Sequence, residues 1–147
     1  MRDTLAIKLS VVTVCWNDRE TIRECLRSIY AGTRSTEFEV IVSDNGSTDG
    51  SAEFIRQNYP QVRVIENGAN FGFSKANNVG VNATKGQYIL ILNPDTVIHD
   101  GALDTFVAFA DRHPELIAAL QRVEARAGGW PAIRAWGDHF LIVLRKT

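Results

Sequence analysis

Three polar clusters in this chain follow directly after apolar runs, and each contains side chains that could bind a ligand. In chain order, the clusters supply Asn17 and Asp18, then Asp44, and then Asp95. If the three runs are parallel strands, their carboxyl ends lie at one edge of a sheet, where α/β proteins bind their ligands. The pattern therefore predicts one ligand-binding edge built from residues that are far apart in sequence.

Asp95 is the candidate for binding a metal ion. It follows Asn93 and the turn-forming Pro94, just after an apolar run at residues 88–92. Mg²⁺ is commonly bound through one or two protein carboxylates and completes its coordination with water and substrate phosphate oxygens, so one carboxylate suffices for a metal–diphosphate site. Turn chemistry alone also explains an aspartate at this position, and the sequence leaves both interpretations open.

Asp44 is the candidate for contacting a nucleobase or a ribose. Its carboxylate follows the run at residues 38–43 and can accept a hydrogen bond from a base imide or a sugar hydroxyl. The sequence Asp-Asn-Gly at 44–46 is also a common turn. Turn chemistry accounts for Gly46 but does not require an acid two residues earlier, which favours a binding role for Asp44.

Trp16 and Lys75 are weaker candidates for the same site. Trp16 ends the run at residues 9–16 and could form a flat wall against a base, although core packing is the commoner fate of such an aromatic. Lys75 follows a glycine-containing loop and could reach a diphosphate as a point charge. A solvated surface lysine is the more common outcome at such a position.

The familiar phosphate-binding motifs are missing from the sequence. No GxGxxG follows residues 9–16, and Gly68 and Gly72 are not followed by the Gly-Lys-Ser/Thr of a P-loop. This pattern disfavours a dinucleotide dehydrogenase and a P-loop NTPase. A nucleotidyltransferase is also disfavoured, because residues 15–19 do not form a glycine- and basic-rich loop. A bound diphosphate would therefore depend on a metal ion for much of its charge compensation.

Length and composition fit one soluble domain. The chain has 147 residues, of which 45% are hydrophobic and 22% are charged. The formal net charge of -1 gives no electrostatic basis for a nucleic-acid partner. Because there is no signal-peptide pattern and no apolar run of about 20 residues, we expect a cytoplasmic chain without a transmembrane segment; membrane association of a full-length form stays open. Cys15 and Cys25 are expected to be reduced core residues.

Strand-like and helix-like segments alternate through residue 113, which predicts an α/β fold: a mostly parallel sheet with flanking helices, Rossmann-like in architecture. The expected strands are residues 9–16, 38–43, 62–65 and 87–92, and residues 140–144 could add an edge strand. Four helices are expected. The first two end near Gly32 and Asn58, and the other two span about 74–83 and about 101–111. Asn17 or Asp18 is placed to cap the first helix, and Gly80 would let the third approach a neighbouring element closely.

Four segments taken together resemble the donor-binding half of the inverting family 2 glycosyltransferases, which have the GT-A fold. The segments are residues 11–17, 42–51, 70–80 and 92–96, in the family's order and at its usual spacing, across roughly residues 8–115. Each segment alone is a weak signal, whereas the four in order are specific. Asn-Pro-Asp at 93–95, in place of Asp-x-Asp, resembles the rhamnosyltransferase-like branch of the family.

The resemblance implies a role for each matched position. Asp95 would bind Mg²⁺ or Mn²⁺, and Asn93, standing where the first Asp of Asp-x-Asp is found, could still hydrogen-bond a sugar hydroxyl. The set implied to bind the donor nucleotide is Val14, Trp16, Asn17, Asp44, Gly72, Lys75, Asn77 and Asn93. The implied reaction is metal-dependent transfer of a sugar, with inversion, from a nucleoside diphosphate-sugar to a saccharide or lipid-linked acceptor, as in polysaccharide biosynthesis.

No catalytic residue is assigned. The resemblance places the general base in a later acidic motif of the acceptor-binding half, and the only acids after Glu115 are Glu124 and Asp138, which form no such motif. We expect residues 1–120 to form the nucleotide-sugar binding domain and residues 121–147 to be a diverged or truncated tail. Such a truncated chain would have little transferase activity. The alternative is a non-catalytic nucleotide-sugar binding or interaction module.

The expected truncation also has a structural consequence. An uncovered sheet edge presents unpaired backbone groups and apolar surface, which proteins normally cover. We therefore expect self-association as a homodimer, using residues 140–144 and the region of Trp130 and Trp136.

Overall fold

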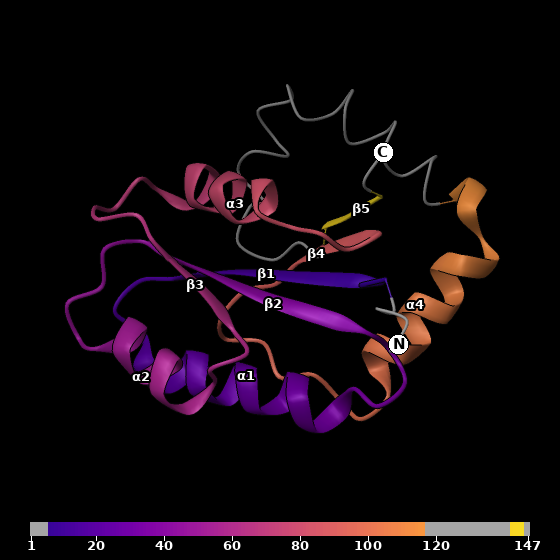
Figure 1. Cartoon of the computed structure of the whole chain (residues 1–147), viewed down its shortest axis with the longest axis horizontal. Helices are drawn as coiled ribbons and strands as arrows, with labels where there is room; N and C mark the ends of the chain where they lie inside the picture. The colour runs from indigo at the N-terminus through magenta and orange to yellow at the C-terminus, as the bar shows by residue number, and fades with distance from the viewer. Residues whose placement is uncertain (1–5, 117–141, 146–147) are drawn as a thin grey trace, which may run out of the picture.

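A five-stranded sheet forms the centre of the computed structural model, which describes residues 6–116 and 142–145 (Figure 1). Within these residues the strand order is β3-β2-β1-β4-β5; β1 to β4 are parallel and β5 is antiparallel to β4. The strands are β1 (Leu9–Cys15), β2 (Phe38–Asp44), β3 (Arg63–Glu66), β4 (Tyr88–Ile91) and β5 (Ile142–Arg145). The helices are α1 (Arg19–Gly32), α2 (Ser51–Asn58), α3 (Phe73–Asn82) and α4 (Ala102–Arg112). The prediction of a mostly parallel α/β sheet with flanking helices is confirmed.

β1 is the central strand because it is buried on both faces and paired on both sides. All seven of its residues are buried. It pairs with β2 over its whole length, from Leu9 opposite Phe38 to Cys15 opposite Asp44. It pairs with β4 from Leu9 opposite Tyr88 onward. A nearly continuous apolar and β-branched run is what such a strand requires.

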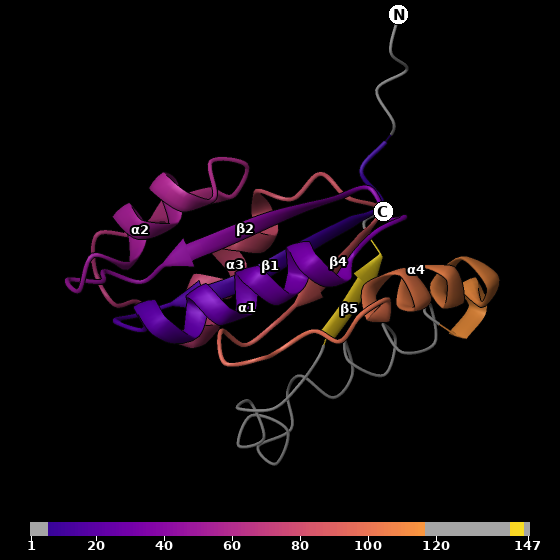
Figure 2. The same ribbon diagram turned by 90° about the horizontal axis from the view of Figure 1, so that it is seen from below.

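Helices cover both faces of the sheet, with α1 and α2 on one side and α3 on the other (Figures 1 and 2). Successive residues of β1 point to opposite faces, so Val11 joins the larger core with α1, α2 and α4, while Val12 joins a smaller one beneath α3. None of the helices in the described part of the chain has the length and apolar character that a membrane span requires.

Gly80 sets the distance between α3 and β1. A Cβ at this position would lie 2.4 Å from Cγ1 of Val12, closer than any normal contact. Ala76 and Gly80 are buried on this face of α3, together with Asn77. The prediction that Gly80 permits close packing is therefore confirmed, and the partner is the central strand.

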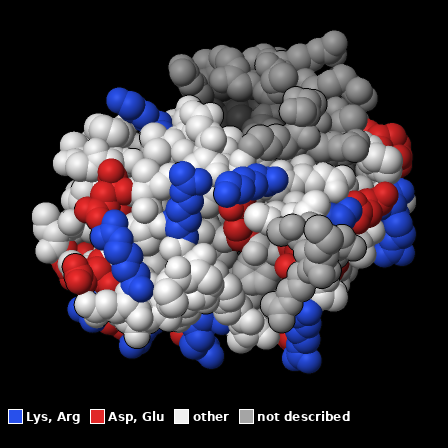
Figure 3. Space-filling view, viewed as in Figure 1, with Lys and Arg blue, Asp and Glu red and all other residues white. Residues whose placement is uncertain are grey.

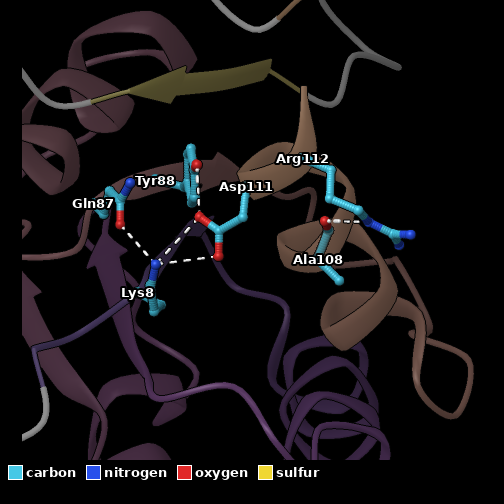
Figure 4. Close-up of polar contacts among 6 residues, drawn as sticks. All are labelled: Lys8, Gln87, Tyr88, Ala108, Asp111 and Arg112. Carbon is cyan, nitrogen blue, oxygen red and sulfur yellow. Dashed lines mark hydrogen bonds and ion pairs between the residues drawn. The ribbon is translucent and has the colours of Figure 1, made fainter. Parts of the chain in front are cut away.

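Polar contacts hold the amino-terminal ends of β1 and β4 against the end of α4 (Figure 4). Lys8 Nζ donates to Oε1 of Gln87 at 3.0 Å and to Oδ2 of Asp111 at 3.1 Å. The hydroxyl of Tyr88 donates to Oδ1 of Asp111 at 3.0 Å. These contacts lie at the amino ends of the strands, whereas Asp44 lies at the carboxyl ends.

Asp104 fastens the first turn of α4 to the segment between α1 and β2. Its carboxylate accepts the backbone N–H groups of Arg34, Ser35 and Thr36 at 2.9, 3.1 and 2.8 Å. Burial by itself raises the pKa of this carboxyl, but these donors outweigh burial and lower the pKa to about 2.

The features predicted for the carboxyl-terminal part of the chain lie partly or wholly outside the described residues. The edge strand expected at 140–144 is present as β5. The diverged or truncated tail expected at 121–147 lies outside the described residues except for this strand, and Trp130 and Trp136 lie outside them as well.

We predict that Gly80→Ala lowers the free energy of unfolding by about 1–3 kcal/mol, because the added methyl overlaps Val12 and forces α3 away from β1. Urea unfolding of the two proteins measures this difference. Asn78→Ala, at an exposed position of the same helix, is the control and should be nearly neutral. The double variant with Val12→Ala should recover part of the loss; strictly additive effects would contradict the proposed contact.

We also predict that Asp104 makes stability depend on pH in the acid range. Its pKa falls from 3.8 to about 2 on folding, so its contribution is fully present above about pH 4 and is lost as the pH falls toward 2. Urea unfolding at pH 5 and at pH 2.5 should show a smaller acid-induced loss for Asp104→Asn than for the wild type. Equal losses in the two proteins would exclude Asp104 as a source of this dependence.

Candidate functional site

The structure brings Asp44 and Asp95 to the same edge of the sheet, as the strand pattern predicted. Asp44 is the last residue of β2, and the segment that carries Asp95 begins directly after β4. Because β1, β2 and β4 are parallel, their carboxyl ends share this edge. The backbone N–H of Leu92 donates to Val12 O at 2.8 Å, which continues the β1–β4 pairing up to the start of the Asp95 segment.

Asp44 has one satisfied and one unsatisfied carboxylate oxygen. The residue is only 2% exposed. Its Oδ2 accepts the N–H of Ser47 at 3.0 Å, whereas its buried Oδ1 has no hydrogen-bond partner among the described residues. Buried polar atoms in native proteins are rarely left unpaired. The unsatisfied Oδ1 therefore indicates a place for a donor group of a ligand or of water.

Asp95 lies exposed in a turn that the N–H of Thr96 closes by donating to Asn93 O at 3.2 Å. Within residues 6–116 and 142–145, no three His, Cys, Asp or Glu residues gather in a way that could hold a metal ion. A cation at Asp95 would thus need further ligands from substrate and water. Burial and the nearby Asp95 carboxylate raise the pKa of Cys25 to about 12, so this thiol stays protonated.

Trp16 is 55% exposed, so the interpretation of this side chain as core is wrong. It lies just beyond β1, where an exposed indole can offer a flat face to a ligand. Val14 is buried in β1. Asn17 has a positive φ of 51°, and its Oδ1 accepts the N–H of Thr48 at 2.7 Å. Asn17 thereby ties the loop after β2 to the end of β1, a structural role that its sequence context did not indicate.

The predicted phosphate-side residues lie at the start of α3. Gly72, with φ of 78°, is the N-cap residue of this helix. Lys75 is an exposed lysine whose Nζ lies 4.1 Å from the ring centroid of Phe71. Asn77 is buried; its Nδ2 donates to Phe73 O at 3.1 Å, and its Oδ1 has no hydrogen-bond partner among the described residues. Asn93 is partly buried in the segment that follows β4, two residues before Asp95.

Asn45 is a site residue that the sequence analysis missed, because turn chemistry accounted for it. Its side chain is nearly fully buried. Its Nδ2 donates to Asn70 Oδ1 at 2.8 Å, and its Oδ1 accepts the N–H of Phe71 at 2.9 Å and Nδ2 of Asn67 at 3.3 Å. This asparagine ladder of residues 67, 45 and 70 joins the end of β2 to the loop before α3. The asparagine-rich loop at 67–72 was the only signal of it in the sequence.

Asp49 accepts the first backbone N–H of two helices at once, and at α1 it makes the side-chain bond that was expected from Asn17 or Asp18. Its Oδ2 accepts the N–H of Arg19, the first residue of α1, at 3.1 Å, and its Oδ1 accepts the N–H of Ser51, the first residue of α2, at 3.0 Å. Asp18 occupies the N-cap position of α1 without a side-chain cap bond. Burial raises the pKa of Asp49, but the donors from Ser51 and Arg19 lower it overall.

Charge on the molecular surface is mixed. Basic and acidic side chains are interspersed over the face shown in Figure 3, as expected for a formal net charge of -1. This distribution gives no extended basic surface on that face of the described residues.

The fold described above is a Rossmann-like α/β fold, and in such folds ligands bind at the carboxyl ends of the parallel strands. Residues 10–146 match the family described as Glycosyl transferase family 2, and the chain belongs to that family. The solved S. aureus TarS 1–349 in complex with UDP shares the fold, with a TM-score of 0.66 at 30% identity over 72% of this chain and 32% of that one.

Two curated relatives illustrate the extent of the match. The N-acetylglucosaminyl-diphospho-decaprenol L-rhamnosyltransferase of Mycobacterium tuberculosis (strain CDC 1551 / Oshkosh) is 31% identical over 121 residues, covering 72% of this chain and 38% of the relative. The uncharacterized glycosyltransferase YibD of Escherichia coli (strain K12) is 33% identical over 106 residues, covering 70% and 30%. This chain thus spans about a third of the length of these relatives.

We predict that Asn45→Ala destabilises the protein by about 1–3 kcal/mol, because buried groups of the ladder lose their partners. Amide hydrogen exchange at Phe71 should accelerate more than exchange in β1, since the loop before α3 loses its anchor. Asn58→Ala removes an exposed side-chain bond to Phe54 O and is the control. Unchanged exchange at Phe71 in Asn45→Ala would show that the ladder does not hold this loop.

Proposed function

We propose that this chain forms the donor-binding part of an inverting, metal-dependent glycosyltransferase. The enzyme would transfer a sugar from a nucleoside diphosphate-sugar to a saccharide or lipid-linked acceptor. The observation that carries the proposal is the buried, unpaired Oδ1 of Asp44 at the same sheet edge as the exposed Asp95. Membership of family 2 supports the class of reaction.

Asp44 is the proposed contact for the nucleobase. An acceptor-only carboxylate oxygen pairs with a donor group, and the imide N–H of uracil or thymine and the N1–H of guanine are such donors on a nucleobase. Uracil is the base we propose, and the UDP and UDP-GlcNAc complexes of the related TarS support it. Trp16 would lie against the base, and Val14 would lie behind it in β1.

Asp95 is the proposed ligand of Mg²⁺ or Mn²⁺. A single exposed carboxylate, with no ligand cluster around it among the described residues, fits an ion that takes its other ligands from a diphosphate and water. Bound there, the ion would stabilise the negative charge on the leaving nucleoside diphosphate. Asn93 would hydrogen-bond a hydroxyl of the donor, and Lys75, at the start of α3 with Gly72 and Asn77, would face the diphosphate side of the site.

Donor binding, more than transfer, is what we propose for these 147 residues alone. Three other acids near this edge already hold structural contacts. Asp49 caps two helices, Asp18 Oδ1 accepts the hydroxyl of Thr21, and Glu66 forms an ion pair with Arg56. We assign no general base among the described residues at this edge. This observation equally favours the second candidate, a non-catalytic nucleotide-sugar binding module.

We predict that Mn²⁺ increases the affinity of the chain for UDP and that Asp95→Ala removes this increase while leaving binding of the metal-free nucleotide nearly unchanged. The expected loss is on the order of tenfold or more in the presence of Mn²⁺, because the diphosphate charge is no longer compensated at the protein. Isothermal titration calorimetry with UDP, with and without Mn²⁺, measures both quantities.

Asp100→Ala is the matched control for this experiment, since Asp100 is an exposed aspartate of the same segment that pairs with Arg34. It should retain the Mn²⁺ effect. Asp44→Asn should weaken uridine and UDP alike, because it changes the base contact. Unaltered UDP affinity in Asp95→Ala with Mn²⁺ would refute the metal role, and release of sugar from UDP-GlcNAc would separate an enzyme from a binding module.

A further inference from the structure

A stripe of small residues on α1 lies directly beneath the segment that carries Asp95. Cys25, Ser28 and Gly32 are spaced three and four residues apart, and all three are buried on one face of the helix. The segment between β4 and α4 runs along this stripe. The stripe is therefore the surface on which the candidate metal-binding turn rests.

Each residue of the stripe makes one contact with that segment. The thiol of Cys25 donates a weak hydrogen bond to Asn93 O, at a sulfur–oxygen distance of 3.9 Å. The backbone N–H of Ile98 donates to Oγ of Ser28 at 2.9 Å. The N–H of Gly101 donates to Gly32 O at 2.8 Å. The three contacts follow the order of the helix and fix the segment at both ends and in the middle.

Ser28 is the strongest of these anchors. Its side chain is 6% exposed, and its hydroxyl donates to Cys25 O at 2.8 Å while it accepts from Ile98. Both hydrogen-bonding functions of the hydroxyl are thus used, which fixes its rotamer. The residue at position 32 also has to be small, because a Cβ at Gly32 would lie 3.2 Å from His99 O.

The anchors flank the turn at residues 93–96. On its amino side, the turn is held by Leu92, bonded to Val12 O, and by the Cys25 contact to Asn93 O; on its carboxyl side, it is held by Ile98 on Ser28. No hydrogen bond or ion pair orients the Asp95 side chain among the described residues. Its placement therefore depends on the backbone of the turn.

We propose that Ser28, assisted by Cys25, is a positioning residue for the Asp95 metal site, acting through the backbone of residues 93–98. This inference rests on the metal role proposed above for Asp95. Groups that orient a metal ligand from outside the coordination sphere typically change metal affinity by about 10–100-fold when they are removed. Because Ser28 acts through the backbone, we expect an effect toward the lower end of that range.

The test uses the whole chain, Mn²⁺ and UDP. In Ser28→Ala, the increase in UDP affinity caused by Mn²⁺ should fall by about tenfold, while UDP affinity without metal should stay within about twofold of the wild type. Titration of Mn²⁺ followed by electron paramagnetic resonance, at saturating UDP, reports the same loss as free Mn²⁺. Thr33→Val is the matched control, since the Thr33 hydroxyl bonds to Ile29 O on the same helix and not to the Asp95 segment.

A second pair of variants covers the case in which Ser28→Ala does not fold. Cys25→Ala should also reduce the Mn²⁺ effect, whereas Cys25→Ser keeps a donor for Asn93 O and should retain it. A merely structural role would lower stability equally in the variants and leave the Mn²⁺ effect intact, and that result would overturn the inference alone. Absence of any Mn²⁺ effect in the wild type would overturn both the metal role of Asp95 and the inference built on it.

Discussion

β1 pairs in parallel with β2 on one side and with β4 on the other, and its two faces are buried beneath helices. The pairing of β1 with β2 places Cys15 opposite Asp44. The pairing of β1 with β4 continues to Leu92, whose N–H donates to Val12 O. A slip of one residue in either pairing would move the side chains of a strand to the opposite face of the sheet and so disrupt both cores. The register that buries the core therefore also brings the Asp44 and Asp95 segments to one edge.

The loops at that edge are held chiefly by amide and carboxylate side chains. Asn45 ties the loop before α3 to β2, Asp49 caps α1 and α2 together, and Ser28 anchors the segment after β4. Each of these side chains accepts a backbone N–H group of another segment. Asp44 keeps a buried oxygen without a partner among the described residues, and Asp95 is exposed. A rigid polar frame around unsatisfied acids is the arrangement expected of a preorganised binding site.

The positions of the acids and the order of strands and helices followed from sequence patterns that act locally. A continuous apolar run marked β1, and helical spacing of apolar residues marked α1. Family 2 membership agrees with the four motifs that carried the resemblance. Trp16 was harder to place, because an aromatic residue at a strand end can turn inward or outward, and only the packing around it leaves it exposed.

The sequence by itself determined the α/β class, the parallel sheet and the strand ends at which Asp44 and Asp95 lie, because apolar periodicity and strand length act over a few neighbouring residues. Only the tertiary structure decided which polar side chains hold the edge together. Asn45 and Asn70 are 25 residues apart, Asp49 and Arg19 are 30 apart, and Ser28 and Ile98 are 70 apart. Hydrogen bonds over such separations depend on how the elements pack in space, and no local pattern of residue types encodes that packing.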